Sequence, residues 1–183
     1  MTEEKQKFTF DKSMLLLTVT LLAFAVVVAG LLGLVNHITW EPIEAHRQAK
    51  TDAAMQAVLY ADTYEALTYT GEDSTVRALY RAGDGGWVVS VAPSGFGGEI
   101  SMVVGVDRDG AVTGVSMIKM SETSGLGANA GRESFRSQFT GKSGQVALVK
   151  QGGDIDALTG ATVTSSAVVR GVNSALAAVA GLS

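Results

Sequence analysis

The sequence contains no cysteine and only 2 prolines among its 183 residues. Without thiols the chain cannot form disulfides, thiolate zinc sites or cysteine-ligated iron–sulfur clusters, so any redox chemistry must come from another cofactor. The two histidines, His37 and His46, have no partner at metal-binding spacing, and we expect no metal site. A net charge of −4 argues against a nucleic-acid partner.

Charged residues are also missing from a long segment near the N-terminus. No Asp, Glu, Lys or Arg occurs from Ser13 to Trp40, and Met14–Val35 is almost entirely apolar. About 20 such residues cross a hydrocarbon core of roughly 30 Å, so we predict a transmembrane helix over residues 13–38. A cleaved signal peptide is the alternative, but its apolar region spans about 7 to 15 residues and is shorter than this one.

The charges beside this segment predict its orientation. Lys5, Lys7 and Lys12 precede it, whereas Arg47 and Lys50 follow it closely. The positive-inside rule then places residues 1–12 in the cytoplasm and the C-terminal domain outside, as a single-pass protein of the cytoplasmic (inner) membrane.

The segment after the span reads as partly helical. Pro42 suits the first turn of a helix, and Ile43–Leu59 has helical spacing, so residues 39–73 form a predicted juxtamembrane helical segment. Within it, Tyr60–Asp73 has no clear period and is expected to be irregular.

The remaining residues, 74–183, predict one domain that combines a sheet with helices. Short β-rich runs are separated by clusters of Asp and Gly, the usual sign of hairpins in an antiparallel meander: Val76–Tyr80, Trp87–Ala92, Met102–Val106 and Val112–Lys119. A short helix over Arg132–Phe139, a strand over Val146–Lys150 and a closing helix over Val163–Val179 complete an α+β domain with flanking helices. The apolar side of the closing helix is predicted to contain Val163, Ala167, Val168, Val172, Ala175, Leu176 and Val179.

A hydroxyl-rich turn, Asp156–Ser165, leads into the closing helix. The free N–H groups and positive dipole end of a helix start favour a bound phosphate. Thr162, Thr164 or Ser165 could equally be an ordinary helix cap without any ligand. The residues alone leave both interpretations open.

At this turn the chain resembles the FMN-binding domain shared by the G subunit of the Rnf complex and the C subunit of the sodium-pumping quinone reductase. The attachment motif of that family is Asp, two variable residues, Ser or Thr, then Gly-Ala-Thr, and Asp156–Thr162 matches it fully. Glu122–Gly127 resembles the family's Glu-Thr-Pro-Gly-Leu-Gly element, with Ser124 in place of proline. Gly95–Gly98 resembles the glycine turn that precedes it.

The resemblance implies that FMN is bound covalently, through a phosphoester to Thr162 made by a flavin transferase that uses FAD and magnesium. Asp156 would position the motif, which also contains Thr159. The other implied contacts of the cofactor fall into two groups. Those near the flavin ring are Glu122, Thr123, Gly125, Leu126 and Gly127, and those near the phosphate are Gly160, Ala161, Thr164 and Lys150.

The resemblance also implies a role as a redox subunit rather than as an enzyme alone. The chain would relay electrons within an Rnf-type ferredoxin:NAD oxidoreductase that drives ion translocation, beside other membrane, iron–sulfur and flavin subunits. Its shortness favours the G subunit over the longer quinone-reductase relative. Two alternatives remain: a free-standing extracytoplasmic FMN protein that feeds other acceptors, and a non-redox anchored assembly domain in which Thr162 only caps a helix.

Overall fold

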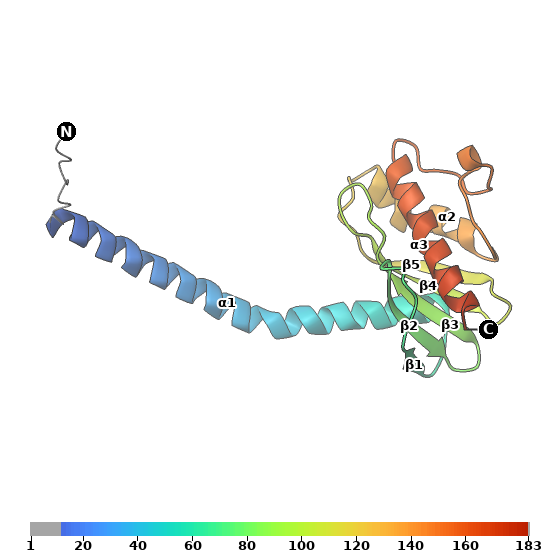
Figure 1. Ribbon diagram of the computed structural model, residues 1–183, viewed down its shortest axis with the longest axis horizontal. Helices are drawn as coiled ribbons and strands as arrows, with labels where there is room; N and C mark the ends of the chain where they lie inside the picture. The colour runs from blue at the N-terminus through green and yellow to red at the C-terminus, as the bar shows by residue number, and fades with distance from the viewer. Residues whose placement is uncertain (1–11, 183) are drawn as a thin grey trace, which may run out of the picture. The chain divides into compact units, whose positions relative to one another are not determined.

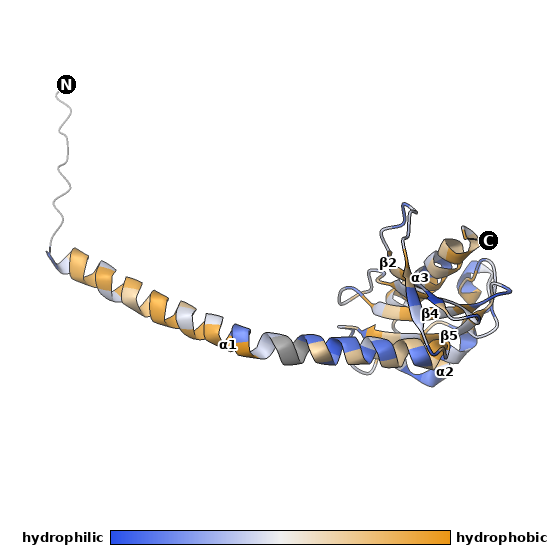
Figure 2. Ribbon diagram, turned by 90° about the horizontal axis from the view of Figure 1, so that it is seen from below, coloured by the Kyte–Doolittle hydropathy of each residue, from blue (hydrophilic) through white to orange (hydrophobic). Residues whose placement is uncertain are grey.

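The N-terminal part of the chain is one long helix. The computed structural model describes residues 12–182, without the side chains of residues 41–43, so the predicted cytoplasmic N-terminus lies outside the described residues except for Lys12. Helix α1 spans Lys12–Val58. Its most apolar window has a mean hydropathy of 2.8 and is 0% buried, and Figure 2 shows the apolar first part and the more polar last part. Helix α1 is therefore a candidate membrane span.

The helix predicted over Ile43–Leu59 is present as the last part of α1, which ends at Val58. Only its separate start at Pro42 is wrong, because α1 continues through that position. A proline inside a helix removes one hydrogen bond of the ladder, while the bonds on either side persist. The contacts between residues divide the chain into two compact units, with the boundary between Arg47 and Gln48. The last turns of α1 therefore belong to the same unit as the sheet.

The predicted antiparallel meander is confirmed. A five-stranded sheet has the order β1-β2-β3-β4-β5, and each strand pairs antiparallel with the next (Figure 1). The strands are Tyr64–Leu67 (β1), Val76–Ala82 (β2), Gly86–Val91 (β3), Ser101–Asp107 (β4) and Val112–Lys119 (β5). Strand β1 corrects the prediction that Tyr60–Asp73 is irregular.

The Asp and Gly clusters make the tight turns that the sequence predicted. In the β4–β5 turn, the Asp107 Oδ1 accepts hydrogen bonds from the N–H of Asp109 (2.9 Å) and of Ala111 (2.8 Å). Gly110 has φ +78°, a conformation that glycine adopts without steric cost. These local bonds fix the turn and hence the register of the two strands.

The segment Val146–Lys150 is not the predicted strand. Residues Val149–Gln151 form a short 3₁₀ helix, η3, and Leu148 makes only an isolated bridge to Ile155. The side chain of Asn173 accepts a bond from the Val146 N–H (2.9 Å) and donates one to the Val146 carbonyl (2.8 Å). A side chain thus satisfies the backbone groups that a neighbouring strand would otherwise bond.

Helices cover both faces of the sheet. Alternate residues of β3 and β4 face opposite ways: Val89 and Val104 pack in one cluster with α3, Thr162–Ala180, and Val88 and Val103 pack in another with the end of α1. Figure 1 shows α3 lying along one face of the sheet. Although α3 is also long and apolar enough to cross a membrane, its apolar window is 61% buried, so it is a core helix of the domain.

The predicted helix over Arg132–Phe139 is present in two short pieces, α2 (Glu133–Arg136) and the 3₁₀ helix η2 (Ser137–Phe139), which follow the 3₁₀ helix η1 (Gly127–Gly131). Phe135 and Phe139 are buried and meet edge to face, with ring centroids 5.6 Å apart. This aromatic pair anchors the segment between β5 and α3 to the core.

Candidate functional site

The site is built at the N-terminal end of α3, where three neighbouring hydroxyls have different surroundings. Ala161 is the N-cap residue, and no side-chain bond caps the helix there. Ser165 is 0% exposed, and its Oγ accepts a hydrogen bond from the Leu158 N–H (2.9 Å) and donates one to the Ala161 carbonyl (2.9 Å). Ser165 therefore closes the loop that precedes the helix.

The other two hydroxyls face different partners. Thr164 is 1% exposed and donates its hydroxyl to the Glu122 Oε2 (2.8 Å). Thr162 is exposed, and among residues 12–182 its hydroxyl has no recorded hydrogen bond. Of the three, only the hydroxyl of Thr162 is open to solvent and unbonded within the described chain.

The loop before Thr162 is bonded to the rest of the domain at Asp156 and turns at Gly160. The Asp156 N–H donates to the Gln138 Oε1 (2.7 Å), and the Gln138 amide donates back to the Asp156 carbonyl (3.4 Å). Gly160 has φ +73°, and a Cβ there would lie 3.1 Å from Leu126 Cδ2. Glycine at this position thus permits both the left-handed turn and the close approach of Leu126.

Two pockets meet at this loop, and Gly160 and Thr162 line both. The first, of about 390 Å³, we call the ring pocket; its lining also includes Phe96, Glu122, Thr123, Leu126, Gly127, Ala161, Val163 and Thr164. The second, of about 350 Å³, we call the lysine pocket; its lining also includes Val149, Lys150, Asp156, Ala157, Leu158 and Thr159. Every residue that the sequence nominated for the cofactor lines one of them, except Gly125, which forms a turn with φ +76° beside Leu126.

The sequence did not single out two apolar residues of the ring pocket. Phe96 is 72% exposed between glycines, and an exposed aromatic in a glycine turn was the available signal. Val163 was predicted on the apolar side of the closing helix, the side that packs on a core, but it is 53% exposed and lines the ring pocket. Val163 lies in the first turn of α3, where the helix borders the ring pocket, so apolar periodicity does not report burial at this position.

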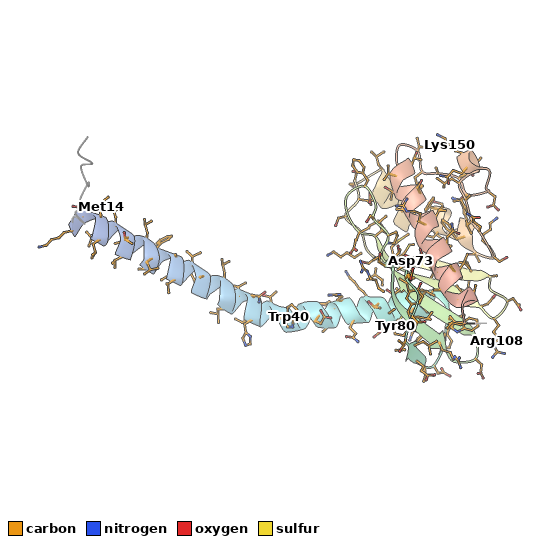
Figure 3. The ribbon with its side chains drawn as sticks, in the orientation of Figure 1. Met14, Trp40, Asp73, Tyr80, Arg108 and Lys150 are labelled. Carbon is orange, nitrogen blue, oxygen red and sulfur yellow. The ribbon has the colours of Figure 1, made fainter. Side chains whose placement is uncertain are left out.

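Among residues 12–182, the two groups with shifted pKa values lie outside both pockets. A hydrogen bond from Ser174 and one from the Thr75 N–H lower the pKa of Asp73, which Figure 3 places beside α3. Burial raises the pKa of Tyr64, on β1. Within residues 12–182, no group of three His, Cys, Asp or Glu side chains is placed to hold a metal ion.

Another pocket, of about 660 Å³, lies at the other end of α3. Trp87, Arg108, Asn173 and Ala180 contribute to its lining. Figure 3 shows Arg108 and Lys150 at opposite ends of the domain. None of the residues nominated from the sequence lines this pocket.

Comparisons with known proteins identify two regions. Residues 95–177 match the family described as FMN-binding domain, and residues 1–58 match the RnfG N-terminal region. The first match contains the ring pocket and Thr162. The two matches together cover both the candidate membrane span and the site.

Relatives are similar over most of the chain. The G subunit of the Na(+)-translocating ferredoxin:NAD(+) oxidoreductase complex of Acetobacterium woodii is 34% identical, covering 93% of this chain and 94% of the relative. The G subunit of the proton-translocating ferredoxin:NAD(+) oxidoreductase complex of Clostridium ljungdahlii is also 34% identical, covering 87% of this chain and 86% of the relative. A solved structure, that of the C subunit of the Na(+)-translocating NADH-quinone reductase from Parabacteroides distasonis, is 24% identical over 56% of this chain and 59% of that chain, with a TM-score of 0.45. From the two relatives and the two matched regions, the chain belongs to the family of G subunits of Rnf-type ion-translocating oxidoreductase complexes.

Proposed function

We propose that this chain is a membrane-anchored electron-transfer subunit of an Rnf-type ferredoxin:NAD oxidoreductase, and that it carries FMN on Thr162 through a phosphoester bond. The relatives that match over most of their length are G subunits of such complexes, which supports the assignment to the complex. One observation supports the attachment residue: of the three hydroxyls at the start of α3, only that of Thr162 is exposed and has no recorded bond in the described chain.

The residues around Thr162 fit an FMN group. Phe96, Leu126 and Val163 offer apolar side chains to a flat ring in the ring pocket. The first turn of α3 presents N–H groups without intrahelical acceptors and the positive end of the helix dipole, which suit a phosphate. Lys150 lines the adjoining lysine pocket and is a further cation available to that phosphate.

Attachment would be a group transfer without a change of oxidation state. The Thr162 Oγ would form a bond to the FMN phosphorus of FAD, the pyrophosphate bond would break, AMP would leave, and the hydroxyl proton would be lost. A flavin transferase that uses magnesium would make the bond. The exposed side chain of Asp156 is accessible to such an enzyme.

The division of labour follows from what each part can do. FMN, when bound, supplies the electron transfer, and the protein supplies position and shields the group from water. A covalent tether holds the group where a dissociated FMN could not readily be recovered. This agrees with a domain outside the cytoplasm, which the lysines before the apolar segment also favour.

Denaturing electrophoresis under ultraviolet light tests the attachment. The full chain is produced with a flavin transferase, as the wild type and as Thr162→Val, which keeps the shape of the side chain but removes its hydroxyl. We expect a fluorescent band for the wild type and none for the variant.

Thr140→Val is the matched control, because it makes the same chemical change at an exposed threonine that lines neither pocket. We expect it to keep the band. A fluorescent Thr162→Val band, or a dark wild-type band with active transferase present, would contradict the proposed phosphoester.

A further inference from the structure

The carboxylate of Glu122 lies at a junction of three segments. Its Oε1 accepts hydrogen bonds from the N–H of Phe96 (2.9 Å) and of Gly97 (3.2 Å). Its Oε2 accepts the hydroxyl of Thr164 (2.8 Å), in the first turn of α3. One side chain therefore joins the β3–β4 connection, the segment after β5 and the start of α3.

Glycines make the room for this carboxylate. A Cβ on Gly95 would lie 2.2 Å from the Glu122 Oε1, and a Cβ on Gly127 would lie 2.7 Å from both the Glu122 Oε2 and the Thr164 Oγ1. Gly97 is packed against the residue before Glu122, because its Cβ would lie 2.0 Å from the Ser121 carbonyl oxygen. Any larger residue at these positions would displace the carboxylate or the turn.

These bonds determine where Phe96 lies. The turn Ser94–Glu99 is closed at its base by the bond from the Gly95 N–H to the Gly98 carbonyl (2.7 Å). At its tip, the recorded bonds of the Phe96 and Gly97 amides within the described chain go to Glu122 alone. The exposed ring of Phe96 forms part of the ring pocket. Its backbone is therefore held to α3 through Glu122 and Thr164.

We propose that Glu122 is a positioning residue, which fastens the Phe96 turn to the first turn of α3 and so sets the width of the ring pocket. The effect of this role on the cofactor rests on the proposed function, because the width of the pocket affects only the FMN that it would hold. Glu122 also lines the ring pocket, and its Oε2 accepts one recorded bond and can accept another, so the expected contact of Glu122 with the flavin ring stays a prediction beside this role.

Hydrogen exchange of the full chain without flavin tests the fastening on its own. We compare the wild type with Glu122→Ala and Glu122→Gln and follow the peptide that contains Phe96 and Gly97. Bonds to a carboxylate are among the stronger ones in proteins, so Glu122→Ala should speed exchange of these amides about tenfold or more. Glu122→Gln should stay near the wild type, because its amide oxygen still accepts both N–H bonds and its NH₂ can donate to the Thr164 hydroxyl.

Glu72→Ala is the matched control, since it removes an exposed carboxylate from the loop between β1 and β2. It should leave the Phe96 peptide unchanged. Unchanged exchange in Glu122→Ala, or exchange in Glu122→Gln as fast as in Glu122→Ala, would overturn the proposal. If Glu122→Ala does not fold, Thr164→Val serves instead. It should speed exchange at the start of α3 and leave the Phe96 peptide protected. Unchanged exchange at the start of α3 would overturn the proposed connection between Glu122 and α3.

Flavin accessibility then tests the consequence. With transferase present, Glu122→Ala should keep the fluorescent band in denaturing gels, because Thr162 is intact, while iodide quenching of the native protein rises toward that of the denatured protein. Quenching equal to the wild type would contradict the role in setting the pocket. A wild type without flavin would instead contradict the proposed function, and the exchange experiment would still decide the positioning role.

Discussion

Replacing Ser165 with alanine should loosen the loop that presents Thr162. The Ser165 hydroxyl is fully buried and bonds both the Leu158 N–H and the Ala161 carbonyl, at 2.9 Å each. Each bond contributes about 1 kcal/mol net, so their loss costs about 2 kcal/mol. The better helix propensity of alanine returns about 0.5 kcal/mol. The expected net loss is about 1.5 kcal/mol, or roughly a tenfold change in the folding equilibrium.

Urea unfolding of the full chain in detergent, followed by tryptophan fluorescence, measures this loss as a lower midpoint at unchanged slope. Ser166→Ala is the matched control, because it makes the same substitution one residue later in α3, at a partly buried position with no recorded hydrogen bond in the described chain. It should lie within about 0.5 kcal/mol of the wild type. Equal midpoints for the two variants would refute the claim that Ser165 holds the loop.

Three further predictions concern other parts of the molecule. Hydrogen bonds lower the pKa of Asp73 below its ordinary 3.8, so its contribution to stability is present above that pH and is lost as the pH falls toward the folded-state pKa. The difference in urea midpoint between the wild type and Asp73→Asn should therefore shrink at low pH. A difference that stays constant would contradict this. Phe139→Ala removes a 0% exposed ring packed on Phe135 and should cost about 3 to 5 kcal/mol in urea unfolding, so a loss below about 1 kcal/mol would show that the core can collapse around the gap. A topology reporter fused after Ser183 should be active outside the cytoplasm, and a cytoplasmic signal would reverse the proposed orientation.

The sequence predicted elements well where local signals and burial agree. The run Val112–Lys119 is a strand with the predicted bounds, because it follows a turn fixed by Asp107 and Gly110. The closing helix begins one residue before its predicted start. The candidate membrane span is likewise indicated by composition, since Ser13–Trp40 contains no Asp, Glu, Lys or Arg.

The wrong secondary-structure predictions lie where contacts between distant residues, and not the local sequence pattern, determine the structure. Strand β1 has only partly buried ends and exposed middle residues, so it carries no alternation, and its pairing with β2 defines it. Val146–Lys150 has the composition of a strand, but the Asn173 side chain, 27 residues away along the chain, bonds the backbone of Val146. Neither the pairing of β1 with β2 nor the bonds of Asn173 to Val146 can be predicted from residues adjacent in the sequence.

The choice among the hydroxyls at the start of α3 shows the same limit within the site. Thr162, Thr164 and Ser165 are equivalent as candidate caps or phosphate contacts when read as sequence, and only a family motif distinguishes the first. In the structure the distinction becomes physical: Thr164 is bonded to a carboxylate 42 residues earlier, and Ser165 is bonded within its own loop. Buried, bonded hydroxyls resist modification because a phosphoester there would break their bonds and displace the packing around them. Under the proposed attachment, the exposed Thr162, which lines both pockets, meets no such obstacle, whereas Thr164 and Ser165 do.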